Sequence, residues 1–201
     1  SVLGQVHNHA DFTRVVPFND LPALEAALAR GDVACLLAEP ALTNFGLVPP
    51  APGFWDEARA LCRRHGTLFV CDETHTISTA LGGYARAHAL QPDFLVVGKA
   101  VAGGLPCAVY GFTDDVAQRM ARAKDAAPEG HSGIGTTLSG NALTLAALQA
   151  ALTHLHTDAS YTPMLALAER LEAGLRERIA RAAKPWTVTR LGARMELQFM
   201  P

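Results

Sequence analysis

Short apolar runs alternate with stretches of helical periodicity, and this alternation constrains the fold more than any other feature of the sequence. The runs lie at residues 33–39, 67–71, 93–97 and 107–112, and helix-like stretches at 21–30 and 54–65 precede the first two. A run that is apolar at every position is typical of a strand buried on both faces of a parallel sheet. Strands that alternate with helices predict an α/β fold, a three-layer α/β/α arrangement around a mostly parallel sheet.

The C-terminal part of the sequence has a different pattern. Residues 162–183 form the clearest amphipathic helix, with an apolar stripe on one side and mixed charges on the other. The stripe consists of Met164, Leu167, Leu171, Leu175 and Ile179. Strand-like runs follow at 187–190 and 194–199. We therefore expect a large α/β domain over residues 1–157, and a linking helix with the first strands of a small α+β domain over residues 158–201.

Composition excludes several classes of protein. The 201 residues are 49% hydrophobic and 18% charged, with a formal net charge of −2, which is typical of a globular chain. No run is long enough for a membrane helix, residues 1–10 lack the regions of a signal peptide, and no block of Lys or Arg favours nucleic acid as a partner. The four cysteines form no Cys-x-x-Cys pair, so we expect free thiols and a cytoplasmic protein.

Two charged residues stand at the C-terminal ends of buried runs, Asp72 directly and Lys99 after one glycine. Asp72 follows the second run and Lys99 comes after the third. Ligands of open parallel sheets bind beyond the carboxyl ends of the strands, and a single crossover would place both residues at that edge. A poorly hydrated lysine is a nucleophile toward carbonyl carbons, and a carboxylate keeps a heterocyclic nitrogen protonated, which together favour pyridoxal phosphate chemistry. Taken alone, Lys99 also fits a lysine extended into solvent, and Asp72 a helix cap or loop anchor.

A third feature is the segment 135–141, Gly-Thr-Thr-Leu-Ser-Gly-Asn, which directly precedes a helix-like stretch. Hydroxyls and backbone N–H groups at a helix N-terminus bind phosphate. Capping of the helix by Ser139 or Asn141 explains the segment as well. The sequence has neither a Walker A loop nor a Gly-x-Gly-x-x-Gly pattern, so no dinucleotide fingerprint is present.

In their order along the chain these motifs resemble those of the class III aminotransferases, pyridoxal-phosphate enzymes of fold type I, and most of all the branch of glutamate-1-semialdehyde aminomutase. The resemblance covers nearly the whole chain from about residue 15 onward. The matching segments are Ala38-Glu39-Pro40, residues 48–54, 71–76, 92–100, 103–106 and 137–141. The resemblance implies pyridoxal 5′-phosphate as the cofactor, a homodimer, and the large domain of fold type I.

The resemblance also implies a role for each matching residue. Lys99 binds the cofactor as an imine and, once released, moves a proton between the substrate Cα and the cofactor C4′. Asp72 binds the protonated ring nitrogen, and Thr74 packs on the face of the ring, where many members have valine. His75 stands near the phenolic oxygen of the ring, where many members have glutamine.

Two further residues match the family, and parts of its pattern are missing. Glu39 matches an acid near the active site, and Thr137 contacts the cofactor phosphate in the site of the partner subunit. The implied substrates are a small amino donor, either an amino acid or an amine, and a keto acid or aldehyde acceptor. Family members are considerably longer and carry a phosphate loop and a substrate-binding arginine outside the matching region. We therefore expect the chain alone to bind cofactor weakly and to turn over little, whether as a transaminase or as an aminomutase.

Two hypotheses from other classes stay open. A chain that keeps the motifs but lacks part of the pocket would act as an inactive dimerising scaffold. Alternatively, His7 and His9 form a His-x-His pair of the kind that binds a metal, and with Lys99 and Asp72 they would make a metal-dependent hydrolase. Only two strand-like residues precede that pair, and 201 residues are fewer than a (β/α)₈ barrel usually needs.

Overall fold

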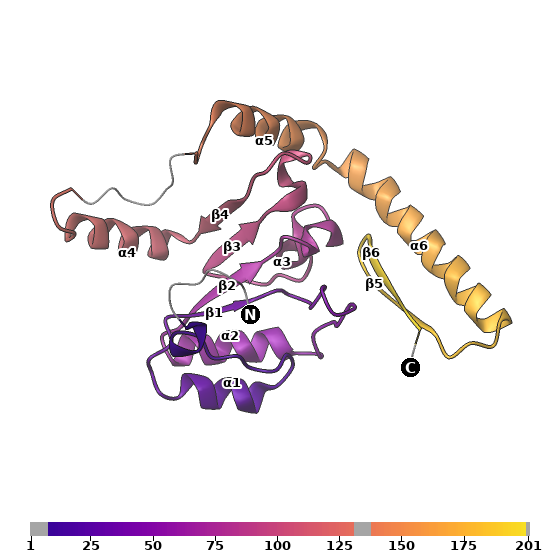
Figure 1. Cartoon of the computed structure of the whole chain (residues 1–201), viewed down its shortest axis with the longest axis horizontal. Helices are drawn as coiled ribbons and strands as arrows, with labels where there is room; N and C mark the ends of the chain where they lie inside the picture. Colours follow the sequence, from indigo (N-terminus) through magenta and orange to yellow (C-terminus); the bar gives the residue numbers. More distant parts are fainter. Residues whose placement is uncertain (1–7, 131–137, 200–201) are drawn as a thin grey trace.

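A four-stranded sheet is the centre of the chain. The computed structural model describes residues 8–130 and 138–199. The strands are β1 (Cys35–Ala38), β2 (Leu68–Asp72), β3 (Phe94–Val97) and β4 (Val109–Phe112), in that order across the sheet. The first three are parallel and β4 is antiparallel to β3 (Figure 1). The predicted mostly parallel sheet is therefore confirmed. The last apolar run forms β4, which is an antiparallel edge strand.

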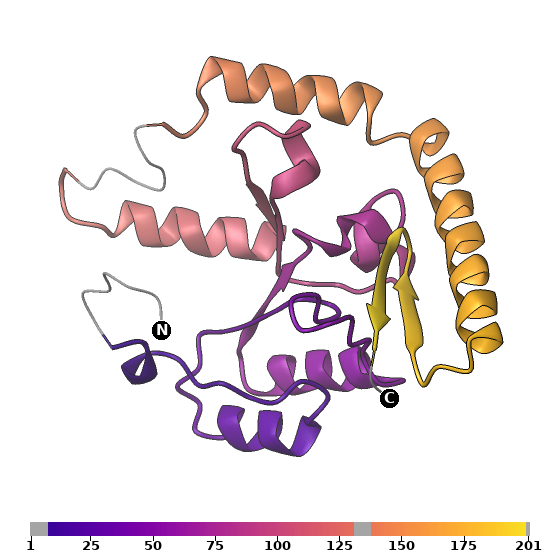
Figure 2. The ribbon, with the colours of Figure 1, turned by 45° about the vertical axis from the view of Figure 1, so that its right-hand side comes forward.

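Helices connect the strands and surround the sheet. The α-helices are α1 (Leu21–Leu28), α2 (Phe54–Arg64), α3 (Gly83–Ala87), α4 (Asp114–Asp125), α5 (Ala142–His154) and α6 (Asp158–Arg181). Three short 3₁₀ helices are η1 (His9–Asp11), η2 (Thr76–Thr79) and η3 (Lys99–Ala102). Helices α1 and α2 lie together beside β1, whereas α4, α5 and α6 form an arc around the sheet (Figures 1 and 2). None of the helices in the described part of the chain is long and apolar enough to cross a membrane.

The main hydrophobic core lies between one face of the sheet and helices α1 and α2. Successive side chains of a strand point to opposite faces, so Phe69 and Cys71 of β2 enter this core together. The Trp55 ring of α2 stacks on Phe69 with 5.0 Å between ring centroids, and its Nε1–H donates to the Pro40 carbonyl at 2.8 Å. Burial raises the pKa of the Cys62 thiol to about 11 and raises that of Cys71 as well. These two cysteines therefore act as small core residues.

The opposite face of the sheet carries a second apolar row. The strand registers align Leu37, Val70, Phe94 and Phe112 across all four strands. This row is partly accessible in the described part of the chain, since Leu37 is 66% and Phe112 is 40% exposed. Asp72 belongs to this face, because it lies two residues beyond Val70.

A second, two-stranded sheet follows α6. Strands β5 (Thr187–Leu191) and β6 (Arg194–Gln198) form an antiparallel hairpin that lies between α6 and the main sheet (Figure 2). Glu172 of α6 accepts a hydrogen bond from Arg190 Nε at 2.5 Å, and Arg176 donates to the Val188 carbonyl at 2.6 Å. The hydrogen bond from Arg190, followed by one from Arg176, lowers the pKa of Glu172. The division into domains at residue 157 stays a prediction.

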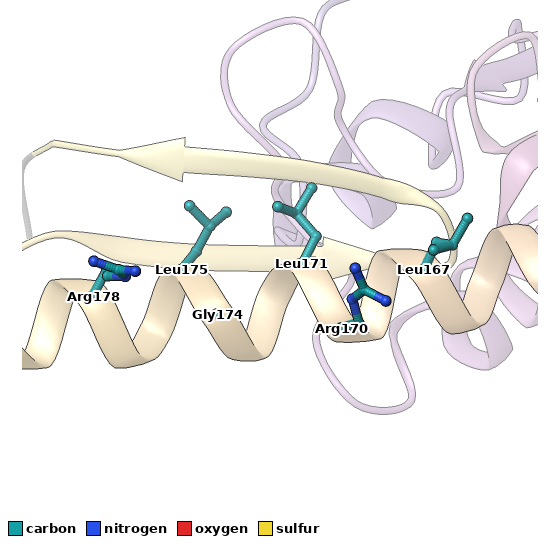
Figure 3. Close-up of a pocket in the computed structure, with 6 residues that line it drawn as sticks. All are labelled: Leu167, Arg170, Leu171, Gly174, Leu175 and Arg178. Atoms are coloured by element: carbon teal, nitrogen blue, oxygen red, sulfur yellow. The ribbon is translucent and has the colours of Figure 1, made fainter.

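The predicted amphipathic helix is α6, and two leucines of its apolar stripe are exposed. Leu167 and Leu171 are 59% and 57% exposed, whereas Ala168 is buried. The side of the helix that bears Glu172 faces the hairpin, where Glu172 binds Arg190. The exposed side of α6 forms a shallow groove (Figure 3). The groove is lined by Leu167, Arg170, Leu171, Gly174, Leu175 and Arg178.

A fully buried carboxylate holds the segment after β2 in place. Glu73 Oε2 accepts hydrogen bonds from Thr76 Oγ1 at 2.9 Å and from Tyr84 N at 2.7 Å, and its Oε1 accepts from Ala85 N at 2.6 Å. Both backbone donors belong to the first turn of α3, where N–H groups lack partners within the helix. A Cβ atom at Gly83 would overlap the carboxylate, so this glycine is needed for the close approach.

We predict that Glu73→Gln lowers the free energy of unfolding by about 2–3 kcal/mol. Both carboxylate oxygens accept hydrogen bonds, and the amide nitrogen of glutamine would face a backbone N–H or the Thr76 hydroxyl instead. Urea denaturation followed by circular dichroism measures the effect. The matched control is Glu57→Gln on the exposed side of α2, which should change the free energy by no more than about 0.5 kcal/mol. Equal effects of the two substitutions would contradict the assigned role of Glu73.

Candidate functional site

Asp72 ends strand β2 with one carboxylate oxygen engaged and the other available. Its Oδ1 accepts a hydrogen bond from Thr74 N at 2.9 Å, which anchors the turn that follows the strand. Its Oδ2 makes no hydrogen bond to the residues that the structure describes, and no cationic side chain among them forms an ion pair with Asp72. The half-buried carboxylate therefore fixes its own loop and still presents an acceptor at the edge of the sheet.

Lys99 lies at the same edge, at the end of the neighbouring parallel strand. Asp72 pairs with Val96 in the β2–β3 register, and the three residues from Val96 to Lys99 span at most about 10 Å. The shared edge predicted for the two residues is thus confirmed. The expectation that Lys99 is poorly hydrated is wrong. Its side chain is exposed, and no described residue covers it or forms an ion pair with it. The amine is therefore accessible and unpaired within the described part of the chain.

Glu39, Thr43 and His75 form a second polar group. The Thr43 hydroxyl donates to Glu39 Oε2 and lies 2.5 Å from His75 Nδ1, and the Glu39 carboxylate is 3.7 Å from the same nitrogen. A hydroxyl has one proton to donate, so when that proton goes to Glu39 the Nδ1–H of His75 must donate to the hydroxyl oxygen. This arrangement leaves His75 Nε2 as the ring atom that is available to a ligand.

The β5–β6 hairpin contacts the segments that carry this polar group. Arg194 Nη2 donates to the Thr43 carbonyl at 2.7 Å, and Ala193 N donates to the Ser78 carbonyl in η2 at 3.1 Å. At the tip of the hairpin, Gly192 has a φ of +59° and packs directly on the backbone of Thr79. The turn between β5 and β6 is therefore in contact with both segments that hold His75.

The junction of α5 and α6 reaches the site from a third direction. The Tyr161 hydroxyl donates to the Ile77 carbonyl at 3.0 Å and lies 3.2 Å from His156 Nδ1. His156 Nε2 in turn lies 3.4 Å from the carbonyl of Ala100, which follows Lys99. Burial raises the pKa of Tyr161, so the phenol stays neutral. This chain of polar contacts joins the loop after β2 to the 3₁₀ turn that carries Lys99.

Some of the predicted residues lie outside the described part of the chain. Thr137 is one of them, so its contact with phosphate stays a prediction. Asn141 caps α5 by accepting from Thr144 N at 2.9 Å, as the capping alternative predicted. His7 is also outside the described residues. Among residues 8–130 and 138–199, no group of three His, Cys, Asp or Glu side chains is placed to hold a metal ion.

Several residues at the site were not predicted. Thr43, Arg194, His156 and Tyr161 follow no buried apolar run and belong to no recognised motif. Thr43 acts through a contact with a residue 32 positions away, and Arg194 through one 151 positions away. The only signal near any of them is the short spacing of Thr43 from Glu39.

The available groups suit a ligand with a carbonyl carbon and a protonated ring nitrogen. Asp72 Oδ2 can accept a hydrogen bond from a ligand, the Lys99 amine can attack a carbonyl carbon once it is deprotonated, and His75 Nε2 is available to a further polar atom of the ligand. Those are the requirements of pyridoxal phosphate. The donor set in the structure thus fits this cofactor.

Comparison with known proteins places the chain in a family. The family profile described as aminotransferase class-III matches residues 6–199. A glutamate-1-semialdehyde 2,1-aminomutase of Anaeromyxobacter sp. strain Fw109-5 is 38% identical over 193 residues, which are 94% of this chain and 43% of that protein. The chain therefore spans less than half the length of the curated relatives it matches.

Solved structures agree with this assignment. The crystal structure of a glutamate-1-semialdehyde aminomutase from Pseudomonas aeruginosa PAO1 is 50% identical, with a TM-score of 0.91 over 97% of this chain and 44% of that one. A second structure of that aminomutase is a complex with PMP. An omega-transaminase from Sphaerobacter thermophilus is 26% identical, with a TM-score of 0.86 over 98% of this chain and 45% of its own. These neighbours confirm the predicted fold class, and the chain belongs to the class III aminotransferases.

Proposed function

We propose that the protein containing this chain moves an amino group with the help of pyridoxal 5′-phosphate. The substrates would be a small amino donor and a keto acid or aldehyde acceptor. The observation that carries the proposal is the placement of Asp72 and Lys99 at the same edge of the sheet, on neighbouring parallel strands. Each offers an atom without a partner in the described part of the chain, Oδ2 of the carboxylate and Nζ of the amine.

Each site residue has a defined task in this proposal. Bound pyridoxal phosphate withdraws electrons from the carbon that carries the amino group. Lys99 Nζ would hold the cofactor at its carbonyl carbon, and as a free amine it would take the proton from the substrate Cα. Asp72 Oδ2 would keep a proton on the ring nitrogen, and His75 Nε2 would bind the phenolic oxygen. Thr43 and Glu39 orient the imidazole of His75 through its Nδ1.

The proposal includes a second copy of the chain. The resemblance to the family implies a homodimer in which Thr137 contacts the cofactor phosphate of the partner subunit. The accessible apolar row on the sheet and the exposed Lys99 are consistent with a site that needs further protein around it. We therefore propose that the chain alone binds the cofactor weakly and has little activity.

We predict that borohydride reduction in the presence of pyridoxal phosphate attaches the cofactor to Lys99 in preference to the other lysines. The sequence contains three lysines, and Lys124 and Lys184 are exposed on helix α4 and after helix α6. Peptide mass spectrometry locates the modification. Lys99→Ala should remove it and lower amino-group transfer by about 10²–10⁴-fold, which is what a positioned general base typically contributes. Lys124→Ala and Lys184→Ala are the matched controls, and an even distribution over the three lysines would contradict the proposal.

We predict that Asp72→Asn weakens cofactor binding by roughly 10–150-fold, because an amide replaces a charged hydrogen bond worth about 1.5–3 kcal/mol. Titration of the cofactor absorbance gives the dissociation constant. Asp125→Asn, at the exposed end of α4, should leave that constant unchanged. If the two variants bind alike, Asp72 does not hold the ring nitrogen.

An aminomutase is the second candidate, and the 50% identity to the Pseudomonas aeruginosa enzyme over nearly the whole chain favours it. An aminomutase moves the amino group within one substrate molecule, so it needs no separate acceptor. We predict that the protein rearranges glutamate 1-semialdehyde when pyridoxal phosphate is present and no keto acid is added. Chromatography of the product measures this. Turnover that depends on an added keto acid would instead identify an aminotransferase.

An inactive scaffold gives a third pattern of results. A folded dimer that takes up no pyridoxal phosphate and transfers no amino group, even with both termini extended by the flanking coding sequence, would contradict the proposed activity. Stoichiometric zinc without cofactor absorbance would support the metal-dependent hydrolase.

A further inference from the structure

A side-chain hydroxyl completes the hydrogen-bond ladder between the strands that carry Asp72 and Lys99. The last regular bond of the β2–β3 ladder runs from Glu73 N to the Val96 carbonyl at 2.8 Å. In a parallel ladder the next bond would join Gly98 N to the Glu73 carbonyl. That carbonyl instead accepts from Ile77 N at 2.9 Å, because the chain has already turned toward η2. Gly98 N donates to Thr74 Oγ1 at 3.2 Å.

The Thr74 hydroxyl is in close contact with Gly98, and no backbone carbonyl of the described residues accepts from Gly98 N in its place. Gly98 is buried, so its N–H would have no water to bond if the hydroxyl were removed. A Cβ atom at Gly98 would lie 3.3 Å from Thr74 Oγ1 and 3.5 Å from Thr74 Cγ2. The strand end therefore packs on both branches of the threonine side chain.

The residue after Gly98 has an unusual backbone. Lys99 has a φ of +50°, the left-handed region that only a few per cent of non-glycine residues occupy. Such a conformation persists where the surrounding structure holds it. Gly98, the residue directly before Lys99, is held through both of its backbone polar groups: its N–H donates to Thr74 Oγ1, and its carbonyl accepts from Val101 N at 3.3 Å.

We propose that the Thr74 hydroxyl is a positioning group that holds Lys99 in register with Asp72. The proposal rests on the proposed role of Lys99 as the residue that binds the cofactor. It adds a function to Thr74 beyond packing on the cofactor ring. The same residue also donates its own backbone N–H to Asp72 Oδ1, so a single residue ties together both strand ends.

Thr74→Val tests the hydroxyl with little change in shape, and Thr74→Ser restores it. The matched control is Thr67→Val at the opposite end of the same strand, where the hydroxyl donates to the Val33 carbonyl at 3.0 Å. Both valine variants lose one hydroxyl hydrogen bond. Only Thr74→Val removes one next to Lys99.

Two measurements on the full chain are needed. Amide exchange by NMR should be about fivefold or more faster at Gly98 in Thr74→Val than in the native protein, and unchanged there in Thr67→Val. Borohydride trapping of pyridoxal phosphate on Lys99, relative to Lys124 and Lys184, should slow by about fivefold in Thr74→Val because the amine is less well oriented. Thr74→Ser should return both values to within about twofold of the native protein.

The outcomes separate this inference from the proposed function. Unchanged exchange at Gly98 in Thr74→Val would overturn the inference whether or not cofactor binds, because this measurement needs no cofactor. Equal slowing of trapping by Thr67→Val would also overturn it, since the effect would then be one of general stability. Absence of trapping at Lys99 in the native protein would overturn the proposed function and, with it, the positioning role assigned to the Thr74 hydroxyl.

Discussion

The register of β2 against β3 is the constraint on which the rest of the site depends. It pairs Asp72 with Val96 and so sets the carboxylate and Lys99 on one edge of the sheet. Side chains alternate along a strand, so a slip of one residue would turn Asp72 toward the core that now contains Cys71 and Phe69. A carboxylate without a partner in that core would be strongly destabilising. The burial of Phe69 and Cys71 in the core therefore fixes the register of β2, and with it the position of Asp72.

Beyond the strand ends, backbone groups do most of the positioning. Glu73 binds two N–H groups of α3, Asp72 binds the N–H of Thr74, and Arg194 binds the carbonyl of Thr43. Contacts of this kind fix the path of the chain and leave other side-chain atoms available. The loop between β2 and η2 is for this reason held mainly through its main chain and the Glu73 carboxylate, although Thr74 and His75 are only half-buried.

Much of the fold and the centre of the site could be predicted from the sequence, because both follow from local pattern. A charge that directly follows an apolar run marks the end of a strand, and Asp72 and Lys99 were found in this way. The contacts of Thr43 could not be found, because its partner His75 is distant in sequence and no periodicity links the two. The apolar stripe of α6 did not indicate which side of the helix faces the hairpin, since Glu172, a charged residue, binds Arg190 there and Leu167 and Leu171 are exposed. The exposure of Lys99 agrees with the alternative of a lysine extended into solvent, and sequence alone could not choose between the two, because hydration depends on what surrounds a strand end in three dimensions.

The close packing of Gly192 on Thr79 limits how the hairpin can vary. A methyl group at position 192 would meet main-chain atoms of Thr79, and these cannot rotate aside as a side chain would. Any residue larger than glycine would lift the tip of the hairpin away from η2 and draw Arg194 from the Thr43 carbonyl. The hairpin and the segment that holds His75 thus move together. Substitutions at this turn would change the geometry of the site, even though Gly192 has no side chain of its own.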